Sequence, residues 1–141
     1  MTTLLTSFQF KRRVRFADTN EFGQVHFDVY IRLMEETEYA FLRSRGLRVV
    51  LDDGKGIIGF PRLHSNVQID KPLRLDDEVE TTLQLIEVSG KKITYEFAIQ
   101  CRGNSIAKGC FEVACCRFPG GKDPYAILIP DFVAEKLCAD N

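Results

Sequence analysis

The sequence predicts an α+β fold, in which one long helix packs on an antiparallel sheet of about five strands. Two observations carry this prediction. A single long helical pattern follows one strand-like segment near the start of the chain, and about four long alternating segments come after it, joined by short turns. Parallel α/β proteins instead alternate strands with helices. The strands are therefore expected to pair antiparallel, with the helix on one face of the sheet.

The first strand is expected at residues 7–17, where polar residues alternate with Phe8, Phe10, Val14 and Phe16. The turn-forming residues of DTNEFGQ (18–24) end it. The basic run KRRVR (11–15) lies within this strand. It is interpreted as a solvated strand face, or alternatively as a site for a polyanion.

A helix is expected at residues 27–45, about 28 Å long. Its apolar stripe has the helical period and consists of Tyr30, Leu33, Met34, Thr37, Ala40 and Phe41. Asp28 is expected to cap the start of the helix, and Gly46 to end it.

The rest of the chain is predicted to be mainly β, with extended segments at 57–70, 78–88, 93–102 and 106–118. A loop at 52–56 precedes them, and a short helix is expected at 130–137. No internal repeat or linker interrupts the chain, so residues 1–141 are expected to form one domain.

Composition excludes several classes of protein. The net charge is −1 with acids and bases interspersed, which disfavours nucleic-acid binding. No apolar run reaches the roughly 20 residues of a membrane span, and the start of the chain does not resemble a signal peptide. The five cysteines are odd in number and form no CxxC motif, and the two histidines lack zinc spacing. A cytoplasmic protein without a disulfide framework or metal site is expected.

The motif RFADTNEFGQVHFDVYIR (15–32), in its strand–turn–helix context, resembles the hotdog-fold thioesterases, and more narrowly the 4-hydroxybenzoyl-CoA thioesterase and YbgC-like group. The resemblance covers about residues 8–120 and is most specific at 15–39. The segment 59–79 supports it, because such proteins carry there a long strand that lines the cleft.

This resemblance implies a sheet wrapped around a central helix and an acyl thioesterase that hydrolyses an acyl-CoA or acyl-carrier-protein thioester to a free acid and a thiol. It further implies a homodimer or homotetramer with clefts built from two chains. No metal or redox cofactor is implied, and coenzyme A is part of the substrate.

Thioester hydrolysis requires a polarised carbonyl, and the unpaired amides at a helix start can supply the donor. The backbone amide of Phe27 is the first choice, and the resemblance points to the same place. Asn20 stands where the 4-hydroxybenzoyl-CoA group has an aspartate. An amide is not a nucleophile, but it can hold a water or donate to the thioester oxygen.

The turn also resembles that of thioesterases from enediyne polyketide pathways, through ADTN followed by Gly23, Val25, Phe27 and Tyr30. That branch is thought to use asparagine, tyrosine and a helix arginine, and this chain has Glu38 in place of the arginine. Glu35 matches an acidic residue common on the helix of the YbgC-like group. It is interpreted as part of a solvated helix face, or as a general base that faces a second subunit and shares a water with Asn20.

Other polar residues near the expected cleft are candidates for substrate binding. His26 is a candidate base, although YbgC-like proteins carry a histidine one residue later, at Phe27. His64 and Asn66 are expected on one face of their strand and Ser65 on the other, as cleft residues or as an outward polar face.

Four further side chains complete the list of candidates. Tyr30 is interpreted as a core residue, or as a residue with its hydroxyl aimed at the acyl group. Asp18 is interpreted as a turn cap. Exposed basic residues such as Arg62 or Lys91 are expected to meet the phosphates of coenzyme A.

The sequence therefore predicts an acyl thioesterase with Asn20, Phe27, Tyr30 and Glu35 at its centre. Two alternatives stay open. One is a polyketide-pathway thioesterase that releases a carrier-bound chain. The other is a non-catalytic module that binds acyl-CoA.

Overall fold

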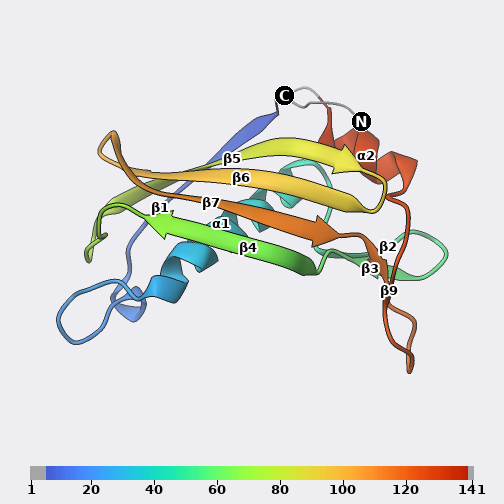
Figure 1. Ribbon diagram of the computed structural model, residues 1–141, viewed down its shortest axis with the longest axis horizontal. Helices are drawn as coiled ribbons and strands as arrows, with labels where there is room; N and C mark the ends of the chain where they lie inside the picture. The colour runs from blue at the N-terminus through green and yellow to red at the C-terminus, as the bar shows by residue number, and fades with distance from the viewer. Residues whose placement is uncertain (1–5, 140–141) are drawn as a thin grey trace.

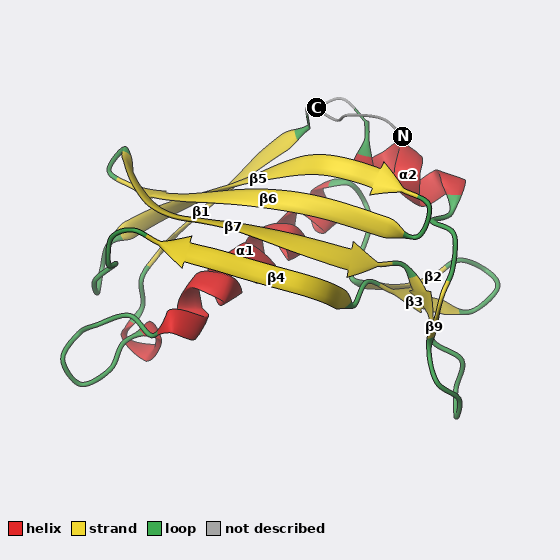
Figure 2. Ribbon diagram, viewed as in Figure 1, coloured by secondary structure: helices red, strands yellow, loops and turns green. Residues whose placement is uncertain are grey.

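A computed structural model describes residues 6–139 and confirms the α+β prediction. The long helix α1 (Phe27–Ser44) lies across one face of a five-stranded antiparallel sheet, as Figures 1 and 2 show. The strand order is β1-β5-β6-β7-β4, so β1 and β4 are the two edges. The strands are β1 (Ser7–Arg13), β4 (Arg62–Ile69), β5 (Glu78–Ser89), β6 (Lys92–Cys101) and β7 (Asn104–Ala114).

A smaller sheet stands at one end of the molecule, in the order β2-β3-β8-β9. Its strands are β2 (Val50–Asp52), β3 (Ile57–Gly59), β8 (Cys116–Arg117) and β9 (Tyr125–Ala126), and a short helix α2 (Asp131–Leu137) follows. Two predicted strands, 57–70 and 106–118, are each split between the two sheets. The first break falls at Phe60–Pro61, where proline has no amide hydrogen to continue a ladder.

The expected first strand, 7–17, is also too long, because β1 ends at Arg13. A 3-10 turn, η1 (Phe16–Asp18), follows it. The Asp18 carboxylate accepts a hydrogen bond from the Arg15 amide at 2.7 Å, which closes the turn. The Arg15 amide thus bonds to a nearby side chain instead of to a neighbouring strand.

The core lies between α1 and the sheet. Buried and more exposed residues alternate along β5 and β6, so one face of the sheet is apolar. Helix α1 covers that face with its buried stripe, which includes Val29, Leu33, Met34, Phe41 and Leu42. The helix ends at Ser44, and Gly46 follows its C-cap with φ of +72°, as expected for a glycine that stops a helix.

Met34 crosses β7 at Gly109, where no side chain fits. A Cβ atom on Gly109 would lie 2.5 Å from Met34 Cε and 2.6 Å from the backbone oxygen of Asn66. We expect Gly109→Ala to lower the free energy of unfolding by about 2 kcal/mol, as overpacking does. Urea denaturation measures this. Gly120→Ala is the control, because its Cβ meets nothing within 4 Å, and an equal loss in both variants would contradict the argument.

All five cysteines are free thiols. Within residues 6–139, neither helix has the length and apolar character needed to span a membrane.

Candidate active site

The turn before α1 is built around the side chain of Asn20. Its Oδ1 atom accepts the amides of Phe22 at 2.9 Å and Gln24 at 3.1 Å. Gly23, with φ of +74°, allows the chain to reverse between them. The Nδ2 group makes one long contact, 3.4 Å to Gln24 Oε1. The side-chain oxygen of Asn20 is therefore engaged by hydrogen bonds within the turn. The side-chain NH₂ group is the part that can donate a hydrogen bond to a substrate.

Helix α1 begins without a side-chain cap. The N-cap residue is His26, and its side chain makes no capping hydrogen bond. The prediction that Asp28 caps the helix is wrong, because its carboxylate binds Arg32 one turn later at 2.7 Å. Within residues 6–139, no hydrogen bond to the Phe27 amide is found. This amide is an open donor at the positive end of the helix dipole.

A shallow hollow of about 320 Å³ lies at the start of α1, lined by Val25, Phe27, Tyr30, Ile69, Asp70, Lys71 and Pro72. Tyr30 is buried, and its hydroxyl accepts the Leu73 amide at 3.0 Å. It therefore packs in the core and also ties the segment after β4 to α1. A larger hollow of about 530 Å³ crosses the outer side of β1, β5 and β6. Charged side chains line it, several of them already paired with one another, as Lys11 is with Glu80.

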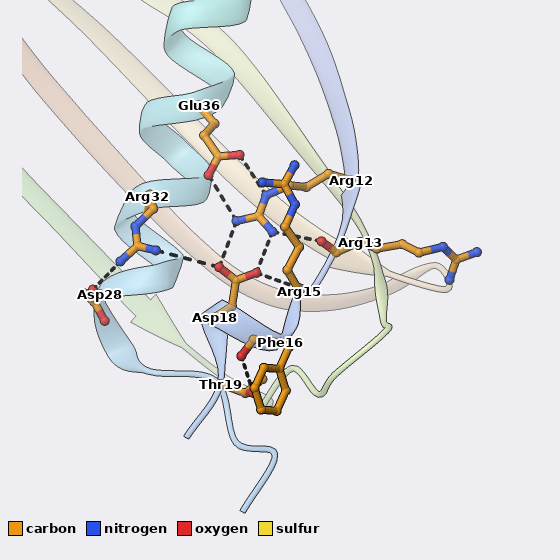
Figure 3. A network of polar contacts seen from close by, with 9 residues as sticks. All are labelled: Arg12, Arg13, Arg15, Phe16, Asp18, Thr19, Asp28, Arg32 and Glu36. Atoms are coloured by element: carbon orange, nitrogen blue, oxygen red, sulfur yellow. Dashed lines mark hydrogen bonds and ion pairs between the residues drawn. The ribbon is translucent and has the colours of Figure 1, made fainter. Parts of the chain in front are cut away.

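Asp18 lies at the centre of a buried ion network that joins β1, η1 and α1 (Figure 3). Arg12 Nη1 lies 2.7 Å from Asp18 Oδ2, and Arg12 Nε lies 2.8 Å from Glu36 Oε1. Burial raises the pKa of Asp18, but Arg12 and the Arg15 amide outweigh it and hold that pKa below its ordinary value. Asp18 is thus an ionised structural residue, and its role as a turn cap is confirmed.

The interpretation of KRRVR as a solvated strand face is wrong for Arg12. Its side chain is almost fully buried, because two carboxylates compensate the loss of water. Lys11 and Arg13 remain exposed on the outer face, where they pair with Glu80 and Glu78.

Farther along α1, Glu35 and Glu38 share one arginine from β4. Arg62 Nη1 lies 2.9 Å from Glu35 Oε2, and Nη2 lies 2.9 Å from Glu38 Oε1. The Glu35 side chain is 35% exposed and that of Glu38 is 2% exposed. The prediction of Arg62 as an exposed phosphate contact is therefore corrected, because two carboxylates already engage it. Lys91 is exposed, as expected.

Glu38 was not among the predicted site residues. Its position carries a signal, since it lies four residues after Met34 and three before Phe41, on the apolar stripe. A buried acid at such a position needs a cation nearby. The cation here is Arg62 on β4, and the helical spacing of the sequence does not show that this strand lies beside Glu38.

The predicted site residues divide into three groups. Asn20, His26, Phe27 and Tyr30 lie at or just before the start of α1. Glu35 stands eight residues after Phe27, which is about 12 Å along the helix axis. Within one chain, the open Phe27 amide and the Glu35 carboxylate therefore do not meet around one water molecule.

The third group lies on edge strand β4. Ser65 stands opposite the core residue Phe111, so it is on the helix side of the sheet. His64 and Asn66 stand opposite Glu112 and Cys110, on the outer side, with 3.4 Å between His64 Nε2 and Asn66 Nδ2. The expected alternation is present, and all three residues are exposed.

Comparison with known proteins shows which family the chain is similar to. The model of the thioesterase-like superfamily matches residues 14–137. A putative esterase of Aquifex aeolicus is 32% identical over 132 residues, 92% of this chain and 97% of the relative. A 1,4-dihydroxy-2-naphthoyl-CoA hydrolase of Synechococcus elongatus is 24% identical over 73% of this chain and 76% of its own. The solved structure of a gentisyl-coenzyme A thioesterase superposes with a TM-score of 0.79 at 25% identity, covering 92% of this chain and 99% of that one.

Proposed function

This chain belongs to the thioesterase-like superfamily, and we propose that it hydrolyses the thioester bond of an acyl-coenzyme A to a free acid and a thiol. The observation that carries the proposal is the open Phe27 amide at the start of α1, a residue that also lines the hollow there. A donor held by a helix needs no reorganisation when negative charge develops on the thioester oxygen. The hollow that Phe27 lines is open to solvent and gives the acyl group a place to enter.

In the proposed reaction, the Phe27 N–H and the Asn20 NH₂ group donate to the thioester oxygen. Asn20 suits a donor role because its own carbonyl already accepts two turn amides. Water adds to the carbonyl carbon, and the thiolate of coenzyme A leaves and takes up a proton. This chemistry needs no metal or redox cofactor.

Glu35 is proposed as the general base, acting on the site of a second copy of the chain. Two observations support a two-chain site. The separation of about 12 Å along α1 prevents Glu35 from serving the Phe27 amide of its own chain. Strand β4 is an edge strand with a 62% exposed leucine, Leu63, and such an edge offers its free backbone groups to another strand. A homodimer is therefore proposed, with paired β4 edges that bring the two α1 helices side by side.

The proposed acyl group is a hydroxylated aromatic one. The Synechococcus relative is named for 1,4-dihydroxy-2-naphthoyl-CoA and the similar solved structure for gentisyl-coenzyme A. Phe27 and Tyr30 line the hollow with aromatic rings, which suit an aromatic guest.

The test is thioester hydrolysis, followed by release of the free thiol, across aromatic, short-chain and long-chain acyl-CoA substrates. We expect Asn20→Ala to lower kcat about a hundredfold on the preferred substrate, because a donor at the reacting centre is lost. Binding without turnover, seen as a rise in melting temperature with acyl-CoA, would favour the non-catalytic module. Turnover of carrier-bound chains alone would favour the polyketide alternative.

Asn20→Asp is the matched control for the turn. A carboxylate still accepts the Phe22 and Gln24 amides but has no N–H to donate. We expect its kcat to fall as well, with the melting temperature closer to the wild type than that of Asn20→Ala. A gain in kcat would show that the turn works best with a carboxylate nucleophile and would contradict the donor role of Asn20.

A further inference from the structure

Glu38 is a buried acid that the proposed reaction does not use. One of its oxygens, Oε1, accepts a hydrogen bond from Arg62 Nη2 at 2.9 Å. The other, Oε2, has no hydrogen-bond partner among residues 6–139. An unpartnered buried carboxylate oxygen is strongly disfavoured when it is charged. This geometry therefore favours the protonated form of Glu38 more strongly than the surroundings of an exposed glutamate would.

Arg62 holds a fixed position between the two glutamates. Its guanidinium carbon lies 4.3 Å from the centroid of the Phe111 ring, which supports the plane of the group from the core side. One Nη atom binds Glu35 and the other binds Glu38. A single positive charge thus serves two acids and cannot neutralise both at once.

The titratable groups that face Glu38 come from three elements within the described part of the chain. They are Arg62 on β4, Glu35 one turn earlier on α1, and the buried hydroxyl of Tyr95 on β6. Burial raises the pKa of Glu38 to about 7, while Arg62 lowers it and the charge of Glu35 raises it. Burial and the charge of Glu38 raise the pKa of Tyr95 well above its ordinary value. Near neutral pH, Glu38 therefore changes its charge while Arg62 stays charged and Tyr95 stays neutral.

We propose that Glu38 is a positioning residue that acts through Arg62 on Glu35, and that the proton on Glu38 sets how strongly Arg62 holds the Glu35 carboxylate. When Glu38 is neutral, Arg62 is committed to Glu35. When Glu38 is ionised, Arg62 is divided between two carboxylates, and a second negative charge lies next to Glu35. Arg62 then holds the Glu35 carboxylate less tightly, which leaves that carboxylate freer to act on a water molecule. The catalytic consequence rests on the proposed function, in which Glu35 is the base.

The first experiment compares pH profiles of kcat between pH 6 and 8 for the wild type and Glu38→Gln, after subtraction of the uncatalysed reaction. Glutamine keeps the shape of the side chain but cannot ionise. We expect kcat of the wild type to rise about tenfold through pH 7, and that of Glu38→Gln to change less than about twofold. Glu80→Gln, which removes an acid that pairs with Lys11 on the outer face of the sheet, should keep the tenfold rise.

The second experiment does not depend on activity. Carbon NMR of glutamate labelled at the side-chain carboxyl follows each acid, and the resonance absent from Glu38→Gln identifies Glu38. We expect Glu38 to titrate near pH 7, and the Glu35 carbon to shift at the same pH in the wild type but not in Glu38→Gln. In Arg62→Ala, the midpoint of Glu38 should rise by about one pH unit or more, because its cation is lost. In Arg62→Lys, which keeps the charge, the midpoint of Glu38 should lie between those of the wild type and Arg62→Ala.

The outcomes separate the two proposals. A Glu38 carboxyl that does not titrate between pH 6 and 8, or a Glu35 carbon that does not respond to it, overturns the inference whether or not thioesters are hydrolysed. A coupled titration in a protein that turns over no thioester upholds the inference and overturns the proposed function. If Glu38→Gln does not fold, the Arg62→Lys and Arg62→Ala titrations of Glu38 carry the same test.

Discussion

Replacing Phe27 with proline should lower kcat several hundredfold while helix α1 stays formed. Proline has no amide hydrogen, so the variant removes the donor proposed to bind the thioester oxygen. Loss of one such donor typically lowers kcat about 100- to 1,000-fold. The assay is single-substrate hydrolysis of the preferred acyl-CoA.

The local geometry makes this substitution unusually selective. Phe27 is the first residue of α1, where proline is well tolerated because no intrahelical bond is lost. The preceding residue, His26, has φ of −66° and ψ of 148°, an extended conformation that a following proline favours. The helix should therefore form as in the wild type, which circular dichroism checks.

Phe27→Ala is the matched control, because it also removes the ring but keeps the amide. The difference between the alanine and proline variants isolates the amide from the aromatic wall of the hollow. Equal kcat values in the two variants would show that the Phe27 amide does not bind the thioester oxygen.

Asp18→Ala should lower the free energy of unfolding by about 4 kcal/mol, the range found when one partner of a buried ion pair is removed. The variant leaves the buried guanidinium of Arg12 with Glu36 as the carboxylate that still binds it (Figure 3). It also removes the acceptor of the Arg15 amide in η1. Chemical denaturation at neutral pH measures the change.

Glu78→Ala is the control for Asp18→Ala. Glu78 pairs with Arg13 at 3.4 Å, but both side chains are more than half exposed. Such surface pairs contribute about 0–1 kcal/mol. A loss for Asp18→Ala as small as that for Glu78→Ala would contradict a stabilising role for the buried network.

The same network predicts how stability depends on pH. The pKa of Asp18 is lower in the folded protein than its ordinary value, so the folded state favours the ionised form. The contribution is fully present above the ordinary pKa of an aspartate and is lost as pH falls through the lowered one. Acid should therefore destabilise the wild type more than Asp18→Ala, and the two unfolding curves should converge at low pH.

The sequence alone determined the main elements of this protein. Period 3.6 located α1 to within a residue of its observed end, and period 2 located β5 and β6, because side-chain direction along a helix or strand depends only on local backbone geometry. The turn-forming residues DTNEFGQ likewise predicted the turn before α1, since turn chemistry is local. The longer motif RFADTNEFGQVHFDVYIR predicted the family by its resemblance to known thioesterases, and the family match over residues 14–137 confirms it. The strands 57–70 and 106–118 were too long because an alternating pattern does not indicate which sheet a segment joins.

Only the tertiary structure decided how the charges are used. Arg12 with Glu36, and Arg62 with Glu35 and Glu38, are pairs between residues 24 to 27 positions apart in the chain. A charged residue in a sequence is expected at the surface, because burial without a partner is strongly unfavourable. Whether an oppositely charged side chain lies close enough to pair depends on which strands cross the helix and at which residues. That is why Arg12 was wrongly expected on a solvated strand face and Arg62 was wrongly expected as a free guanidinium, although the fold around them was predicted correctly. The capping role of Asp28 was wrong for a local reason, because its carboxylate pairs with Arg32 one turn later on the same helix.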